Sequence, residues 1–150
     1  MSDLRSLYQE IILDHNKNPR NFRTIPDADR TIDGYNPLCG DHYTIFLKLN
    51  GDRIVDVAFH GSGCAISKAS ASVMSTVLKG KSTEEALAWF EKFHQLVRGE
   101  FHGAQDIEHL GKLAAFGGVS EFPARVKCAI LAWHAVRGAL VSKERSVTTE

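Results

Sequence analysis

The stretch DHYTIFLKLNGDRIVDVAFH, residues 41–60, contains two alternating runs of apolar residues with a turn sequence between them. Apolar side chains occupy every second position: Tyr43, Ile45, Leu47 and Leu49 in the first run, and Val55, Val57 and Phe59 in the second. This period of two is typical of β-strands that bury one face. In the turn sequence NGD at 50–52, Gly51 accepts the left-handed backbone that a tight turn requires. Residues 42–60 therefore predict a β-hairpin.

The flanking sequence predicts one more strand before the hairpin and helices on both sides of it. RTIDGY at 30–35 is the further strand, and apolar residues at helical spacing cover a segment from Asp3 to HNKNPRN at 15–21, then 65–79, 82–97 and 120–141. A capping box from Ser82 to Glu85 marks one helix start. Grouped strands followed by helices predict an α+β fold, with a three-stranded antiparallel sheet packed against helices in two layers.

The length of 150 residues suits a single domain, 1–150. We expect HNKNPRN to stop the first helix and to dock on the rest of the fold. The glycine-rich connection at 98–119 is long enough to predict a functional or mobile segment with at most one short helix. Residues 143–150 predict a flexible tail.

Charge and hydropathy indicate the kind of partner. Lys plus Arg equals Asp plus Glu at 18 each, which does not favour nucleic acid or an anionic membrane surface as a partner. No signal peptide or membrane-spanning run is predicted, so we expect a cytoplasmic protein that binds small molecules or other proteins. Three cysteines cannot all pair within one chain, and disulfides are the least favoured interpretation.

Each cysteine falls where the predicted local structure changes, which suggests one shared site. Cys39 and Asp41 flank Gly40 before the hairpin, Cys64 opens a helix, and Cys128 is early in the last helix. A helix N-terminus stabilises a thiolate, the form that binds metals. Three thiolates and a carboxylate would complete a tetrahedral zinc site. The alternative, that each cysteine is a small buried apolar residue, stays open.

The chain also resembles a known family, the iron–sulfur cluster assembly proteins of the IscU/NifU N-terminal type, and within it the SufU branch. The resemblance lies in LYQEIILDHNKNPRNF, NPLCGD, GSGCAISKASAS and FPARVKCAILAW, which together cover nearly the whole chain. Two features separate it from the general scaffold branch. Lys127 stands where the scaffolds have a histidine before the third cysteine, and 98–119 is similar to an insertion of the SufU branch.

The resemblance implies an IscU/SufU-like fold in which Cys39, Asp41, Cys64 and Cys128 hold zinc. It further implies that Cys39 accepts persulfide sulfur from a SufS-type cysteine desulfurase, a pyridoxal-phosphate enzyme, for delivery to SUF cluster assembly proteins. The protein is then a sulfurtransferase and desulfurase activator rather than an enzyme that acts alone. Two alternatives remain: a scaffold that assembles a [2Fe–2S] cluster, or bound iron, on the same residues, and a non-catalytic zinc module that only docks other proteins.

Two basic residues near the third cysteine are further candidates. Arg125 is three residues before Cys128, on nearly the same helix face, and could hydrogen-bond Asp41 or a cysteine sulfur; the alternative is an ordinary solvated arginine. Lys127 is expected to be exposed, either as an ordinary solvated lysine or as a cation that favours incoming sulfur. His60 is interpreted as a structural histidine rather than a ligand.

Overall fold

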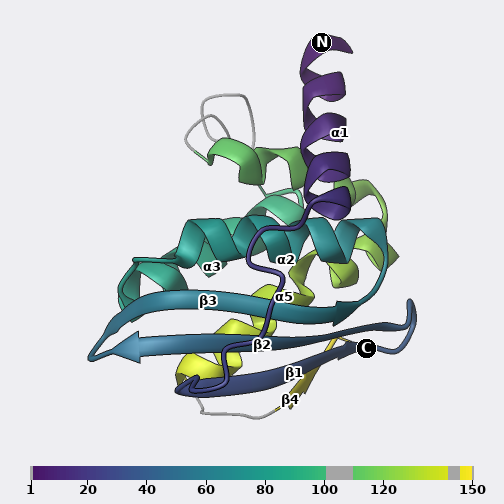
Figure 1. The fold of residues 1–150 in the computed structure, drawn as a ribbon. Helices are drawn as coiled ribbons and strands as arrows, with labels where there is room; N and C mark the ends of the chain where they lie inside the picture. The colour runs from purple at the N-terminus through teal and green to yellow at the C-terminus, as the bar shows by residue number, and fades with distance from the viewer. Residues whose placement is uncertain (1, 101–109, 142–145, 150) are drawn as a thin grey trace.

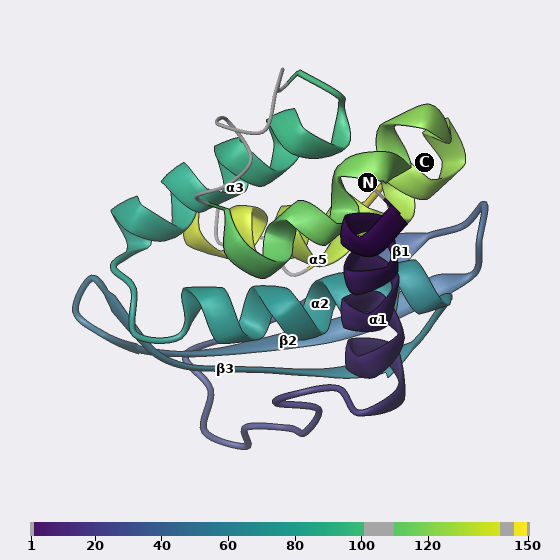
Figure 2. The same ribbon diagram turned by 90° about the horizontal axis from the view of Figure 1, so that it is seen from above.

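A mixed sheet carries its helices on one face, while the connection between the first helix and the first strand crosses the other face (Figures 1 and 2). The computed structural model describes residues 2–100, 110–141 and 146–149. Its elements, in chain order, are α1 (Ser2–Lys17), β1 (Arg30–Asn36), β2 (Asp41–Asn50), β3 (Arg53–Ser62), α2 (Ala65–Leu78), α3 (Thr83–Val97), the 3₁₀ helix η1 (Gly111–Glu121), α5 (Pro123–Val141) and β4 (Ser146–Thr148). The predicted α+β fold is confirmed.

The predicted hairpin forms the centre of the sheet. The strand order is β3-β2-β1-β4, with β2 antiparallel to both β1 and β3. Gly51 has a φ of 62° in the turn, as the sequence predicts. The alternating apolar residues of β2 point to the helices, and Ile45 and Leu47 have no exposed surface.

The sheet has one strand more than the three that the sequence predicts. Ser146–Thr148, within the predicted tail, pairs parallel with Asp33–Tyr35 of β1, and the N–H of Thr149 donates to the carbonyl of Tyr35 at 2.9 Å. A strand of three residues is too short to show an alternating pattern. Its pairing satisfies backbone groups along the open edge of β1, which no local sequence signal reports.

Helix α2 packs against β3 on one side and against α1, α5 and η1 on the others, so it is buried around most of its circumference. Besides apolar residues, it buries four serines: Ser67, Ser70, Ser72 and Ser75. Small side chains allow neighbouring elements to approach closely, and each buried hydroxyl finds a hydrogen-bond partner.

The segment HNKNPRN docks on two of these serines, as expected. His15 Nδ1 lies 2.7 Å from Ser72 Oγ, which also accepts a 2.8 Å hydrogen bond from the N–H of Arg20. Asn21 Nδ2 donates to Ser75 Oγ at 2.9 Å. These bonds hold the end of α1 against α2.

Other predicted segments have mixed outcomes. The capping box at Ser82 and Glu85 is confirmed. In the 98–119 connection, residues 101–109 lie outside the described part of the chain, and the remainder contains the start of η1. Over the described ranges, none of the helices combines the length and apolar character needed to cross a membrane.

Candidate metal centre

Three of the four predicted ligands meet at one end of the sheet. One ligand atom from each of Cys39, Asp41 and Cys128 lies within 4.8 Å of the other two, and the two sulfurs are 3.2 Å apart. Cys39 is exposed, whereas Asp41 and Cys128 are buried, with exposed fractions of 2% and 0%. The cluster therefore has one ligand facing solvent and two facing the core.

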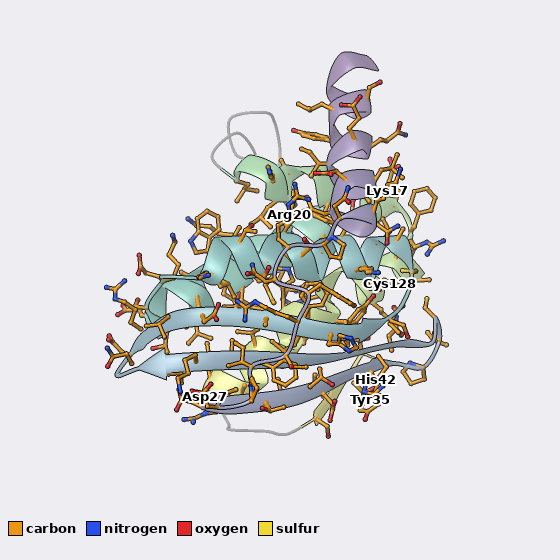
Figure 3. The ribbon with its side chains drawn as sticks, viewed as in Figure 1. Lys17, Arg20, Asp27, Tyr35, His42 and Cys128 are labelled. Carbon is orange, nitrogen blue, oxygen red and sulfur yellow. The ribbon has the colours of Figure 1, made fainter. Side chains whose placement is uncertain are left out.

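A tight turn brings Cys39 and Asp41 together. The N–H of Cys39 donates to the carbonyl of Asn36 at 3.2 Å, and Gly40 has a φ of 71°, which glycine adopts without strain. Asn36, the last residue of β1, pairs with Asp41, the first residue of β2, at the end of the ladder next to this turn. Cys128 approaches from α5, which packs against β1 and β2. Figure 3 shows it at the end of the molecule where that helix meets the turn.

Two hydrogen bonds orient the carboxylate of Asp41. Its Oδ1 accepts from the N–H of Cys64 at 2.8 Å, and its Oδ2 accepts from Asn36 Nδ2 at 3.1 Å. The amide of Asn36 also lies 3.4 Å from the sulfur of Cys128, and Asn36 is only 1% exposed. Sequence reasoning missed Asn36. The available signal was its place at the end of the first strand, three residues before Cys39.

Glycine is required where the chain passes the carboxylate. A Cβ at Gly63 would lie 2.5 Å from Asp41 Oδ1, 2.6 Å from Ser67 Oγ and 2.8 Å from the hydroxyl of Tyr43. These distances are well below van der Waals contact. The close approach of this backbone is therefore part of the site.

Cys64 lies beside the cluster, but its sulfur has a different partner. It is the N-cap of α2, and its Sγ accepts a 3.4 Å hydrogen bond from the N–H of Ser67. Its half-buried side chain is close enough to Cys128 for its charge to raise the pKa of that thiol. The structure thus places Cys64 next to the site without its sulfur among the three convergent ligand atoms.

The electrostatics of the cluster fit a divalent cation. The pKa of Cys128 is raised far above its ordinary value, chiefly because the thiol is buried. Hydrogen bonds with Cys39 and Asp41 raise this pKa further, and so does the charge of Cys64. Burial likewise raises the pKa of Tyr43, so its hydroxyl stays neutral beside Ser67, 3.2 Å away. No cationic side chain in the described part of the chain is hydrogen-bonded to the three ligands. A metal ion that replaces thiol protons suits this acidic, cation-poor donor set.

The two basic candidates do not touch the ligands. Arg125 is exposed, and the described residues show no hydrogen bond from it to Asp41 or to a cysteine sulfur. It lines the rim of an open pocket of about 1030 Å³ that reaches Cys64, with Tyr8, Ile12, Val119 and Phe122 among the apolar lining residues. Lys127 is half-buried rather than exposed. Roles for Arg125 and Lys127 in the chemistry stay predictions.

His60 packs against an aromatic ring, in line with the interpretation of a structural histidine. Its ring packs at a tilt against Phe22, with a centroid separation of 4.9 Å, and it is not part of the ligand cluster that the described residues form. Tyr35 and His42 stack on each other 4.3 Å apart on neighbouring strands (Figure 3).

Comparison with known proteins identifies the family. The model of the NifU-like N terminal domain matches residues 7–141. The chain belongs to this family. Its fold agrees with a solved NifU-like protein (N-terminal) from Brucella abortus at a TM-score of 0.78 and 22% identity, covering 91% of this chain and 95% of that one.

More similar members of the NifU-like family carry two kinds of name. The zinc-dependent sulfurtransferase SufU of Bacillus subtilis (strain 168) is 42% identical over 143 residues, 95% of each chain. The iron–sulfur cluster assembly scaffold protein IscU of Streptococcus pyogenes serotype M1 is 40% identical over 140 residues, 93% of this chain and 86% of that one.

A solved structure supports the same placement. A putative scaffold protein for the SUF system from Fervidobacterium islandicum AW-1 superposes with a TM-score of 0.80 at 37% identity, covering 87% of this chain and 94% of that one. The chain is an iron–sulfur cluster assembly protein of the SufU/IscU family, with a candidate metal site at Cys39, Asp41 and Cys128.

Proposed function

We propose that this family member is a zinc-dependent sulfurtransferase. In this role it accepts persulfide sulfur on Cys39 from a SufS-type cysteine desulfurase and passes it to the SUF assembly machinery. The observation that carries the proposal is the asymmetry of the cluster. Cys39 is exposed on a glycine turn, whereas its partners Asp41 and Cys128 are buried and fixed.

Four residues are assigned to the metal. Cys39, Asp41 and Cys128 would hold zinc, and the adjacent Cys64 would complete the set of four ligands. When bound, zinc keeps cysteine sulfurs in the thiolate form and lowers their nucleophilicity. Asn36 and the N–H of Cys64 orient Asp41 and so position the carboxylate for the ion.

Cys39 performs the transfer. Its thiolate attacks the outer sulfur of the desulfurase persulfide, a new S–S bond forms on Cys39, and the bond to the desulfurase cysteine breaks as that cysteine leaves as a thiolate. The exposure of Cys39 allows the donor to reach it from solvent. The same exposure makes Cys39 the ligand that a partner can displace most readily.

Lys127 favours the sulfurtransferase over the scaffold. The resemblance places a histidine, a possible cluster ligand, at this position in the scaffold branch, and lysine does not serve that role at neutral pH. The similarity to the zinc-dependent SufU of Bacillus subtilis agrees with this choice. A [2Fe–2S] scaffold and a purely structural zinc module are the competing outcomes of the test below.

The test combines metal analysis with desulfurase kinetics. Aerobically purified protein should contain zinc by emission spectrometry and should increase the cysteine turnover of a SufS-type desulfurase. Cys39→Ala should abolish this increase, whereas the control His60→Gln, at an exposed position outside the cluster, should retain it. Stimulation that survives in Cys39→Ala would exclude sulfur acceptance at Cys39. A stable brown chromophore after reconstitution with iron and sulfide, without zinc in the purified protein, would identify a scaffold.

A further inference from the structure

The open pocket beside the metal centre has the features of a protein-docking site. Residues of α1, η1 and the starts of α2 and α5 line its volume of about 1030 Å³, and Cys64 is one of them. Helix α1 lies beside η1 in both ribbon views (Figures 1 and 2). Resting on the proposed function, we infer that this pocket docks the protein that donates the persulfide. The docked segment presents a large apolar side chain to the pocket and an acidic residue to Arg125.

The walls of the pocket offer an apolar anchor point. Tyr8 and Ile12, one turn apart on α1, line it together with Val119 of η1 and Phe122 at the end of η1. Phe122 is 59% exposed, so its ring stands in water beside a hollow. Apolar side chains that fill such hollows supply most of the binding energy of many protein interfaces. The pocket therefore suits an apolar side chain of another protein.

Two opposite charges at the pocket are available to a partner. Within the described part of the chain, neither Glu121 nor Arg125 forms a side-chain ion pair or hydrogen bond. Their separation of four residues would let them pair along a continuous helix. Phe122 prevents this, because its extended backbone, with φ −130° and ψ 90°, ends η1 before α5 begins. A segment with an acidic residue facing Arg125 and a basic residue facing Glu121 is complementary to this rim.

The position of the pocket favours the sulfur donor over other occupants. Arg125 lies one helical turn before Cys128, and Cys64 forms part of the pocket wall. A donor protein has to bring its persulfide sulfur to within about 3–3.5 Å of Cys39, and a standard interface covers about 800 Å² of each partner. Leu38, next to Cys39 in the chain, is 68% exposed and adds a second apolar contact. A second copy in the pocket would instead cover this end of the molecule and obstruct the donor.

Gly118 allows the pocket to be filled without disturbing the core. It lines the pocket, and nothing lies within 4 Å of a Cβ added there. Gly118→Phe puts a ring where the donor's anchor is expected, and Arg125→Glu reverses the charge that the donor's acidic residue meets. Val55→Phe is the matched control. It adds the same ring at an exposed apolar position near the start of β3, at the end of the hairpin away from the metal centre.

The experiment measures docking and chemistry separately on the full chain as purified. Isothermal titration calorimetry gives the affinity for a SufS-type desulfurase. Peptide mapping by mass spectrometry follows persulfide on Cys39, delivered either by the desulfurase with cysteine or by glutathione persulfide. We expect Gly118→Phe and Arg125→Glu each to weaken desulfurase binding tenfold or more and to slow charging by the desulfurase. Glutathione persulfide needs no docked segment and should charge both variants as fast as the wild type, and Val55→Phe should match the wild type throughout.

The outcomes separate this inference from the proposed function. Desulfurase binding by Gly118→Phe and Arg125→Glu as tight as by the wild type overturns the inference and leaves sulfur acceptance at Cys39 intact. Slow charging of both variants by both donors would indicate damage to the metal centre and would also overturn it. A wild type that acquires no persulfide on Cys39 from the desulfurase overturns the proposed function, and the inference with it. Wild-type dimers in light scattering that Gly118→Phe abolishes would assign the pocket to a second copy instead.

Discussion

The N–H of Cys64 donates a 2.8 Å hydrogen bond to Oδ1 of Asp41, and this bond joins the N-terminus of α2 to the first residue of β2. Asp41 is 2% exposed, so its carboxylate is held by protein groups rather than by water. The other oxygen accepts from Asn36. A single buried carboxylate thus fixes the geometry of the metal site and connects two elements of the fold.

Two substitutions at Asp41 should separate these roles. Asp41→Asn removes the negative charge but keeps an oxygen for the N–H of Cys64, so zinc affinity should fall by an order of magnitude or more with little change in stability. Asp41→Ala also leaves that N–H without its partner, which should lower the free energy of unfolding by a further amount of about 1–3 kcal/mol. Competition with a chromogenic chelator measures affinity, and urea denaturation measures stability. Equal effects of Asn and Ala on stability would contradict the anchoring role of Oδ1.

Gly63 should tolerate no side chain. In Gly63→Ala the new Cβ would overlap Oδ1 of Asp41 at 2.5 Å, so either the backbone or the carboxylate must move. Overpacking of this kind costs about 1–3 kcal/mol, and zinc affinity should fall with it. Gly118→Ala is the matched control, because nothing lies within 4 Å of its added Cβ. Urea denaturation of the two variants should show a clear loss only for Gly63→Ala; equal midpoints would contradict the close approach.

His15 should make stability fall with acid. Burial, assisted by the charges of Arg20 and Lys112, lowers the pKa of His15 from 6.5 to about 4, and its Nε2 has no hydrogen-bond partner among the described residues. Above pH 6.5 both the folded and the unfolded states hold a neutral imidazole, so stability is unaffected. Between pH 6.5 and about 4 the unfolded chain takes up a proton that the folded chain refuses, and stability falls by at most about 1.4 kcal/mol per pH unit.

The measurement is the urea midpoint at pH 7 and pH 5 for the wild type, His15→Gln and His60→Gln. His15→Gln should lose stability at pH 7, since the fit beside Ser72 is disturbed, but should show a smaller drop on acidification. His60→Gln, at an exposed ring, should follow the wild type. A drop in His15→Gln as large as in the wild type would assign the acid sensitivity to other groups, such as His134, whose pKa burial also lowers.

Ser70 should couple α2 to α5. Its hydroxyl donates to the carbonyl of Ala129 at 2.5 Å and accepts from Trp133 Nε1 at 3.2 Å, and all these groups are buried. Ser70→Ala leaves the indole N–H without a partner, so the free energy of unfolding should fall by about 1–3 kcal/mol. Tryptophan fluorescence during urea denaturation measures the change. Thr76→Ala on the exposed side of α2 is the control and should stay within about 0.5 kcal/mol of the wild type.

Local patterns predicted much of this fold because local energetics determine it. The hairpin of β2 and β3 follows from alternation around Gly51, and the start of α3 follows from the Ser82–Glu85 capping box. Strand β4 was missed because its stability comes from pairing with a strand more than 100 residues away, between Ser146 and Asp33. The buried serines of α2 were missed for a related reason, since helical spacing cannot show that a helix is enclosed on several sides.

Three residues of the candidate metal site were predictable from the sequence, but their geometry was not. Spacing and resemblance identified Cys39, Asp41 and Cys128, which the structure brings together. They did not show that the sulfur of Cys64 caps α2, a local contact with the N–H of Ser67. Nor did they show that Asn36 is buried against Asp41 and Cys128, because that depends on how β1 packs against β2 and α5. The expected contact of Arg125 with Asp41 is absent from the described part of the chain, where Arg125 instead faces an open pocket.

The enclosed position of α2 restricts how its sequence can vary. At Ser67, Ser70, Ser72 and Ser75 a larger side chain has no free volume to enter, and an apolar one of equal size leaves a neighbour's polar group unpaired. Both size and polarity are therefore constrained at the same positions. Mutational drift in this protein should be slowest along this helix, even at positions that never meet a metal or a partner.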